Sequence, residues 1–273
     1  MILVPMAGAG KRFADVGYAL PKPFIPTTYR NDGKKYPMVV CAVRDLPRSE
    51  DEKIIFISRT EFEEKGYNDE LRRFFPGAVI INVDRLTEGQ ACTCLLAKEL
   101  INSSEPLLIG GCDNGMAYDP AKFTEMSGKA DVLVFTYRHN DCVLGDPAAY
   151  GWVKTDGEDN AVDVSVKKPI SDDPINDHAI VATFWFRHGS DFVKCAEEMI
   201  AANDRINGEF YVDQSIKYCI GAGLSVKAFE IDRYIGWGTP ADYENYEKTL
   251  EYWHKFTSGA AFIPGDIRET EKC

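Results

Sequence analysis

Short apolar runs alternate with amphipathic stretches along most of the chain, and the two patterns predict different elements. The early runs are apolar at nearly every position, which is typical of strands covered on both faces of a sheet. Apolar residues at helical spacing, bounded by Pro or Gly, fall between these runs. Strands are predicted at 2–6, 54–58, 78–83, 106–110, 131–137, 150–155, 161–167, 179–187 and 226–231. Helices are predicted at 38–46, 61–75, 90–101, 190–203, 213–221 and, after Thr239 as N-cap, from Pro240 to about Phe256.

The order of these elements predicts the fold class. Strand and helix alternate in the first half, which indicates a parallel, doubly wound sheet with helices on both faces. The second half has more strands per helix, so we expect a mixed, mostly parallel sheet in a three-layer, Rossmann-like α/β arrangement. No linker rich in Pro, Gly or Ser divides the chain. We therefore predict one domain over 1–256, in two halves over 1–112 and 113–256, and a C-terminal tail over 257–273.

Composition narrows the classes of partner and the compartment. The 273 residues carry a net charge of −12, which argues against nucleic acid and anionic membranes as main partners, because both require basic surfaces. No apolar run approaches the ~20 residues of a membrane span, and the N-terminal run stops at glycines too early for a signal peptide. The eight cysteines show no Cys-x-x-Cys spacing, and several lie in apolar patterns. They predict reduced, mostly buried thiols in a cytoplasmic protein.

The first predicted strand runs into a glycine-rich turn with two cations, Lys11 and Arg12. A third cation, Lys22, follows between two prolines. Glycine allows unusual backbone dihedrals and leaves amide groups open, so such a turn can face an anion while the cations supply full charges. This pattern favours a polyphosphate ligand over an ordinary strand-to-helix turn. The turn itself consists of Ala7, Gly8, Ala9 and Gly10.

Two well-known phosphate loops do not fit this turn. A dinucleotide fingerprint requires a third glycine where the chain has Phe13. A P-loop requires glycine where the chain has Pro5, and Ser or Thr where it has Arg12. The polyphosphate site must therefore be of another kind.

The turn over 8–12, together with Leu20-Pro21-Lys22-Pro23, resembles the signature of the sugar-phosphate nucleotidyltransferases. The resemblance spans about residues 2 to 250 and implies the nucleotidyltransferase fold, which is of the GT-A type. It implies that 1–112 binds a nucleoside triphosphate and that 113–256 binds the acceptor. The turn, with Lys11, would wrap the triphosphate, and Arg12 and Lys22 would contact its phosphates as catalytic residues.

An acid follows the strand predicted at 106–110. Asp113 lies at the carboxyl edge of that strand, where ligands bind in open α/β sheets. A lone carboxylate beside a triphosphate suits Mg²⁺, which prefers hard oxygens and few protein ligands. Asp-Asn-Gly is also good turn chemistry, so Asp113 as a turn former or N-cap is the alternative. The resemblance implies that Asp113 is the catalytic metal ligand and Mg²⁺ the cofactor.

A second nucleotide contact is expected where Glu88 and Gly89 precede the helix predicted at 90–101. Glycine before a helix permits close approach of a flat base or a phosphate, although a plain helix start explains it equally well. The family has a glycine here that lies against the base. Residues 84–87 lack the glutamine that thymidylyl- and uridylyltransferase relatives often use, so the sequence does not identify the base.

The acceptor-binding residues are expected in the second half. The resemblance assigns Tyr150, Gly151, Lys168 and Glu209 to this side, with Lys168 holding the acceptor phosphate. The family often has Glu-Lys-Pro where this chain has Lys167-Lys168-Pro169, so recognition of sugar hydroxyls is expected to differ. The alternative for the two lysines is a solvated strand end. Asp213 is expected to cap the helix that follows it.

The closing motif over 235–242 departs from the family in one residue. Relatives frequently have an aspartate that completes the metal site where this chain has Gly236. Three alternatives remain open: Asp113 and the substrate phosphates hold the metal alone, Asp213 or Asp232 substitutes, or activity is impaired.

These features predict an enzyme that transfers a nucleoside monophosphate from a triphosphate to a phosphorylated small molecule and releases pyrophosphate. The segments over 87–97, 167–171 and 207–215 look most like enzymes of bacterial capsule and surface-polysaccharide gene clusters, which implies an activated precursor for such a polymer. A homo-oligomer is compatible with the sequence, which does not fix the oligomeric state. The alternatives are a GT-A glycosyltransferase and a non-catalytic nucleotide-binding module.

Overall fold

The computed structural model describes residues 1–257, and its main sheet has nine strands. These are β1 (Ile2–Pro5), β4 (Ile54–Arg59), β5 (Val79–Val83), β6 (Leu107–Ile109), β8 (Val132–Tyr137), β9 (Gly151–Thr155), β10 (Ala161–Val166), β11 (His178–Phe186) and β12 (Val226–Glu230). The main path runs β10-β9-β11-β6-β1-β4-β5, while β8 joins β11 to β12. The pairs β6/β1, β1/β4, β4/β5 and β8/β12 are parallel, and β11 runs antiparallel to its partners. The mixed Rossmann-like sheet is thus confirmed.

Two small antiparallel ladders lie beside the main sheet. One pairs β2 (Pro26–Thr28) with β3 (Lys35–Pro37), and the other pairs β7 (Asn114–Ala117) with β13 (Arg233–Gly236). The helices that connect the strands are α1 (Lys11–Asp15), α2 (Met38–Arg44), α3 (Thr60–Glu64), α4 (Asn68–Phe74), α5 (Gln90–Leu95), α6 (Lys98–Ile101), α7 (Pro120–Ser127), α8 (Cys142–Gly145), α9 (Gly189–Ala201), α10 (Val212–Gly221) and α11 (Pro240–Thr257). Two 3₁₀ turns, Lys22–Phe24 and Pro147–Ala149, complete the described elements.

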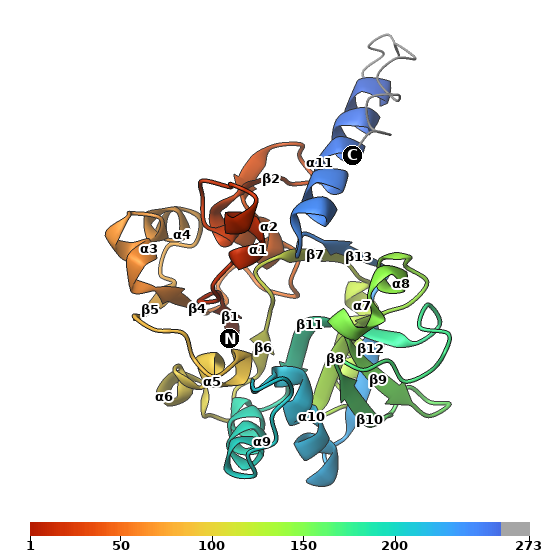
Figure 1. The fold of residues 1–273 in the computed structure, drawn as a ribbon. Helices are drawn as coiled ribbons and strands as arrows, with labels where there is room; N and C mark the ends of the chain where they lie inside the picture. The colour runs from red at the N-terminus through yellow and green to blue at the C-terminus, as the bar shows by residue number, and fades with distance from the viewer. Residues whose placement is uncertain (258–273) are drawn as a thin grey trace.

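The two faces of the sheet build two separate apolar cores, because side chains alternate along each strand. On β1, Leu3 packs beneath α5, α9 and α10, whereas Ile2 and Val4 pack beneath α2, α3 and α4. Figure 1 shows these helix groups on opposite sides of the strands. Strands from both predicted halves pair directly, since Ile109 of β6 faces Phe184 of β11. The division into halves at residue 112 stays a prediction.

The elements predicted from the sequence agree with the structure in their order, with two corrections. The helix predicted at 61–75 is broken into α3 and α4 at Gly66, whose φ of 74° leaves the right-handed helical region. The helix predicted at 90–101 is interrupted at Leu96 and Ala97, between α5 and α6. The predicted tail lies outside the described residues, except Thr257, which ends α11.

The last helix, α11, packs only at its beginning. The hydroxyls of Tyr243 and Tyr246 each donate to a backbone carbonyl of β2, at 2.7 Å. Farther along, Trp253 and Phe256 are 53% and 61% exposed, and Figure 1 shows this end of the helix standing away from the sheet. The aromatic side chains of α11 are therefore better buried near its start than near its end.

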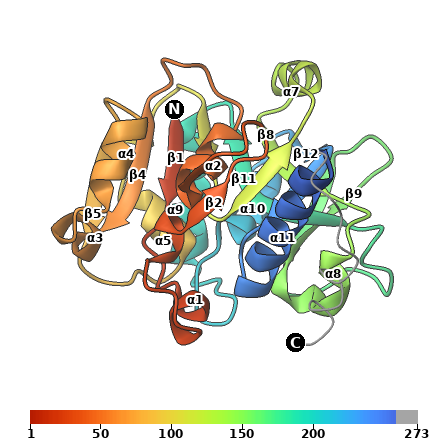
Figure 2. The same ribbon diagram turned by 90° about the horizontal axis from the view of Figure 1, so that it is seen from above.

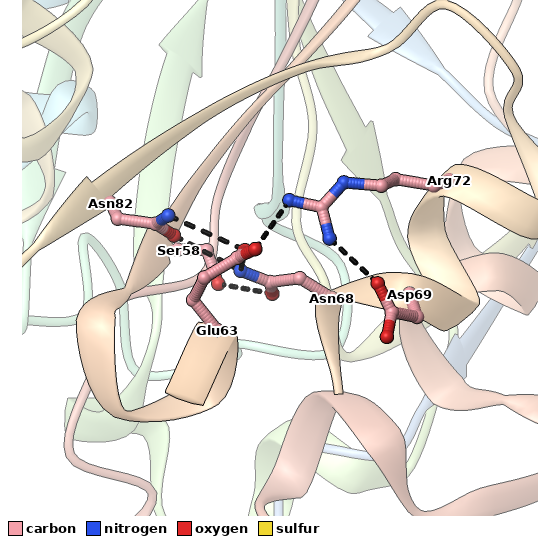
Figure 3. A network of polar contacts seen from close by, with 6 residues as sticks. All are labelled: Ser58, Glu63, Asn68, Asp69, Arg72 and Asn82. Carbon is pink, nitrogen blue, oxygen red and sulfur yellow. Dashed lines mark hydrogen bonds and ion pairs between the residues drawn. The ribbon is translucent and has the colours of Figure 1, made fainter. Parts of the chain in front are cut away.

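A buried polar network fixes α3 and α4 against the edge of the sheet (Figure 3). Asn68 is fully buried and accepts a hydrogen bond from the Ser58 hydroxyl of β4 at 2.8 Å. Its amide donates to Glu63 at 2.7 Å and to Asn82 of β5 at 3.0 Å. Every polar group of the Asn68 side chain thus has a partner. These hydrogen bonds fix the position of α3 beside β4.

We predict that Asn68→Ala lowers the free energy of unfolding by about 2–4 kcal/mol, because it empties volume and leaves the buried Ser58 hydroxyl without its acceptor. Arg72→Ala is the matched control: Arg72 pairs with Glu63 in the same network but is 47% exposed, so we expect a loss under about 1 kcal/mol. Urea denaturation of both variants checks the difference. Equal losses would contradict the role given to Asn68.

Candidate functional site

A cleft of about 420 Å³ opens at the carboxyl ends of β1 and β6. Residues from the glycine-rich turn, from the Pro-Lys-Pro segment and from the end of β6 line it together. The turn, Lys22 and Asp113 were each singled out in the sequence, and the fold brings them to one place. The main lining residues are Gly8, Ala9, Gly10, Pro21, Lys22, Pro23, Gln90, Gly111, Cys112 and Asp113.

The glycine-rich turn begins directly after β1. Gly10 has a φ of 61°, in the left-handed region, and α1 starts at the next residue. Glycine adopts this conformation without steric cost, so the chain can reverse here. Phe13 is buried in α1 and anchors the short helix, while Lys11 and Arg12 are exposed. The turn residues Gly8, Ala9 and Gly10 line the cleft, but Lys11 and Arg12 are not among its lining residues, so their contact with a ligand stays a prediction.

Lys22 is the residue at which three distant segments of the chain meet. Its ammonium group forms an ion pair with the Asp113 carboxylate and donates to the Gly238 carbonyl at 3.0 Å. It also lies 5.5 Å from the centre of the Phe13 ring. The Lys22 side chain is only 15% exposed, so its charge is held within the protein rather than in bulk water.

Asp113 is neither a helix cap nor only a turn former. The element that follows it is the strand β7, and the Asp113 carbonyl accepts from the Trp237 amide at 3.0 Å. Its side chain is 33% exposed, and the carboxylate faces Lys22. A partly exposed carboxylate of this kind is a suitable ligand for Mg²⁺ beside phosphate oxygens, since Mg²⁺ takes one or two carboxylates and completes its shell with phosphates and water.

The space at Gly236 is taken by a neighbouring ring. A Cβ atom added there would lie 3.2–3.3 Å from the ring and hydroxyl of Tyr234, which stacks on Tyr137 at 4.3 Å. Asp232 is exposed and lies beyond the other end of the β7/β13 ladder. At ~3.3 Å per residue, its backbone is about 13 Å from that of Gly236. Within residues 1–257, no three His, Cys, Asp or Glu side chains gather as a metal-binding group. Whether a second carboxylate completes the metal site with Asp113 stays a prediction.

The glycine at position 89 is required by the chain's own packing. Gly89 has a φ of 128°, and a Cβ atom there would lie 2.5 Å from the backbone of Phe210. The Phe210 amide donates a hydrogen bond to the Glu88 carbonyl at 2.8 Å, and the Ala91 amide donates to the Phe210 carbonyl at 3.0 Å. The Glu88 side chain pairs with Arg205 at 2.9 Å. The contact of Glu88 and Gly89 with a base stays a prediction, while the next residue, Gln90, does line the cleft.

On the predicted acceptor side, the lysine that packs beside Tyr150 is a different one from the lysine expected there. Lys168 is exposed. Lys167, with a φ of 59°, turns inward, donates to the Ala149 carbonyl and lies 5.7 Å from the centre of the Tyr211 ring. The Tyr150 hydroxyl donates to the Cys142 carbonyl at 3.0 Å.

Asp213 is buried and packs its carboxylate against Gly151. It lies inside the first turn of α10, which begins at Val212, so its expected role as the N-cap is wrong. Burial raises the pKa of the Asp213 carboxyl to about 6, and the charge of Lys167 offsets part of this shift. The carboxylate of Asp213 lies beside Gly151, and its role as a substitute for the missing acid at Gly236 stays a prediction.

Sequence reasoning missed one wall of the cleft. Arg59 ends β4, and Glu61, Phe62 and Lys65 follow on or just after α3; all four line the cleft together with the glycine-rich turn. The signal in the sequence is a polar residue, Arg59, at the carboxyl end of a strand, which is where ligands bind in open α/β sheets.

The family model described as nucleotidyl transferase matches residues 1–206. The chain belongs to this family. No curated protein matches it significantly. Within residues 1–257, no helix of this nucleotidyltransferase family member is long and apolar enough to cross a membrane.

Solved structures show the same fold. A nucleoside-diphosphate-sugar pyrophosphorylase from Vibrio cholerae RC9 is 20% identical, with a TM-score of 0.74, and the match covers 91% of this chain and 100% of that one. A putative glucose-1-phosphate thymidylyltransferase from Bacillus anthracis is 16% identical (TM-score 0.69; 91% and 94% covered). The inositol-1-phosphate CTP transferase from T. maritima is 19% identical (TM-score 0.63; 96% and 97% covered).

We predict that Asp213 makes stability fall as pH rises. Its pKa is about 6 in the folded protein and ordinarily 3.8, so the folded state holds a proton that the unfolded state has lost. This contribution is complete below pH 3.8 and is lost as pH rises through 6, by at most about 3 kcal/mol. Asp213→Asn should remove that decline, and Asp163→Asn, at an exposed position, should not. Urea denaturation at pH 4.5 and pH 7 measures it, and identical pH dependence in both variants would contradict the assignment.

Proposed function

We propose that the protein transfers a nucleoside monophosphate from a nucleoside triphosphate to a phosphorylated small molecule and releases pyrophosphate. One observation carries this proposal: Lys22, Asp113 and the glycine-rich turn line one cleft at the carboxyl edge of the sheet. Membership of the nucleotidyl transferase family supports the reaction class. The cleft also lies at the carboxyl ends of the strands, where ligands bind in open α/β sheets.

The triphosphate would lie along the turn formed by 7–10. Backbone groups of the turn and the Lys11 ammonium would face its phosphates, and Arg12 would bind the leaving β- and γ-phosphates. Glu88 and Gly89 would lie on the base side. Asp113 would hold Mg²⁺, which would neutralise phosphate charge when bound.

The acceptor would enter from the second half of the chain. Lys168 would hold its phosphate, and Tyr150, Gly151 and Glu209 would contact the rest of the molecule. An exposed lysine suits this role, because its flexible stem can follow a phosphate that arrives from solvent.

The reaction needs no covalent enzyme intermediate and no catalytic base. A phosphate acceptor already carries nucleophilic oxygens at neutral pH, so positioning and charge neutralisation are enough for in-line attack on the α-phosphorus. Lys22 would exchange its bond to Asp113 for one to the α-phosphate, where negative charge develops. None of the four histidines, at 139, 178, 188 and 254, lines the cleft, which agrees with this scheme.

The product would be an activated precursor for a cell-surface polysaccharide, made in the cytoplasm, as the segments over 87–97 and 207–215 suggest. Structural neighbours named for a thymidylyltransferase and for a CTP transferase differ in both base and acceptor, so the fold supports either choice.

The absence of an acid at Gly236 favours one second candidate, a nucleotide-binding module without turnover. A glycosyltransferase is less consistent with the site, because such enzymes usually require an Asp-x-Asp pair where this chain has Asp113-Asn114-Gly115.

A pyrophosphate-release screen tests the proposal directly. It combines the common nucleoside triphosphates with phosphorylated sugars, polyols and amino alcohols in the presence of Mg²⁺. We expect pyrophosphate from at least one pair. Triphosphate binding without release from any pair would overturn the transferase and support the binding module, whereas transfer of a sugar without pyrophosphate would support a glycosyltransferase.

We predict that Lys22→Ala lowers turnover by at least about 10²-fold, or ~2.7 kcal/mol of transition-state stabilisation. Lys22→Arg keeps the charge beside Asp113 and should retain more activity. Lys129→Ala is the control, because Lys129 forms an exposed pair with Glu125. Steady-state kinetics and circular dichroism check the three variants. A folded Lys22→Ala protein with nearly full turnover would contradict the assignment.

A further inference from the structure

The wall of the cleft formed by the end of β4 and by α3 carries cations that the family signature does not include. Arg59 is the last residue of β4, and Lys65 follows α3; both line the cleft with Gly8, Ala9 and Gly10. They face the same cavity as Lys22 and Asp113, so they belong to the site and not to a remote surface.

The position of Arg59 follows from the pairing of two parallel strands. Pro5 at the end of β1 is paired with Ile57 of β4, so Arg59 lies two residues beyond that pair, at the same edge as the turn that leaves β1. In Figure 2, β1 and β4 point toward the end of the molecule where α1 and α3 lie. Parallel strands thus place a guanidinium beside the glycine-rich turn.

The Arg59 side chain is held but not saturated. Its guanidinium lies 5.7 Å from the centre of the Phe62 ring, and its contact with Glu61 is 3.4 Å. The same Glu61 carboxylate accepts from Lys65 at 2.7 Å. Two cations share one anion, which leaves a net positive charge on the wall. The Arg59 side chain is 30% exposed, and its ion pair within residues 1–257 is with Glu61, so other donors of its guanidinium remain open to a ligand.

The expected ligand is negatively charged, so a further cation in the cleft would stabilise its binding. A triphosphate with one Mg²⁺ still carries a net charge of about −2, and Lys22 is already bonded to Asp113 and to the Gly238 carbonyl. An exposed pair such as Arg59–Glu61 contributes little by itself, whereas a guanidinium binds phosphate through two parallel hydrogen bonds. Exchange of Glu61 for phosphate oxygens is therefore favourable.

We propose that Arg59 binds the terminal phosphates of the nucleoside triphosphate, and that Glu61 holds the guanidinium in place before the ligand arrives. The inference rests on the proposed function only for the class of ligand, a triphosphate. Lys65 adds charge to the wall, and Arg59 supplies the directed hydrogen bonds.

Calorimetry on the full chain with Mg²⁺ tests this. The probes are the triphosphate among ATP, CTP, GTP, UTP and dTTP that binds most tightly, the matching monophosphate, and inorganic tripolyphosphate. For Arg59→Ala, we expect Kd to rise about tenfold for the triphosphate and for tripolyphosphate, and less than twofold for the monophosphate. Arg59→Lys should recover part of the loss, and Lys129→Ala should change nothing.

An equal loss for mono- and triphosphate, or no loss for either, would overturn the inference. So would a wild-type chain that binds no triphosphate, and that result would overturn the proposed function as well. If wild-type protein binds the triphosphate and Arg59→Ala shows the selective loss, but no acceptor gives pyrophosphate, only the proposed function fails. Circular dichroism of each variant separates lost binding from lost folding.

Discussion

The ion pair between Lys22 and Asp113 is the interaction on which the site depends. It joins residues 91 positions apart, and the Gly238 carbonyl brings a third segment to the same ammonium group. Without a ligand, each charge neutralises the other in a place only partly open to water. In the proposed reaction, both partners turn to substrate: the lysine to the α-phosphate and the carboxylate to Mg²⁺. The ion pair thus holds in place two groups that would bind the ligand and the metal in the proposed reaction.

The sheet explains why these segments meet. β1, β4 and β6 are parallel neighbours, so the residues that follow each strand come out at one edge. The turn follows β1, Arg59 ends β4 and Asp113 follows β6. The β7/β13 ladder then brings Gly236, Trp237 and Gly238 back from the far end of the chain to that edge.

The second half contributes through packing that is equally specific. The backbone of Phe210 lies so close to Gly89 that a side chain at 89 would overlap it, which couples the loop before α5 to the loop before α10. Lys167 and Asp213 lie together beside Gly151, where relatives are expected to recognise sugar hydroxyls. The proposed acceptor side would therefore contain two charged residues, Lys167 and Asp213.

Much of the fold could be predicted from the sequence, because local patterns carry it. Apolar runs, continuous in the early strands, marked every strand of the main sheet, and the turn before α1 was recognisable from its glycines and cations. Features that depend on contacts between distant segments could not be predicted. The inward turn of Lys167 instead of Lys168 depends on a single left-handed residue, and the approach of Phe210 to Gly89 leaves no local signal. In the sequence, Arg59 is only a polar residue at the end of a strand; its place at the cleft follows from the pairing of β4 with β1.

A crystal structure with Mg²⁺ and an α,β-methylene nucleoside triphosphate tests the central claim most directly. The account predicts the triphosphate in the cleft between the glycine-rich turn and Asp113. It also predicts the Lys22 ammonium at hydrogen-bond distance from a phosphate oxygen and no longer paired with Asp113. A nucleotide bound elsewhere, or bound in the cleft with the Lys22–Asp113 pair intact and no contact with the turn, would contradict it.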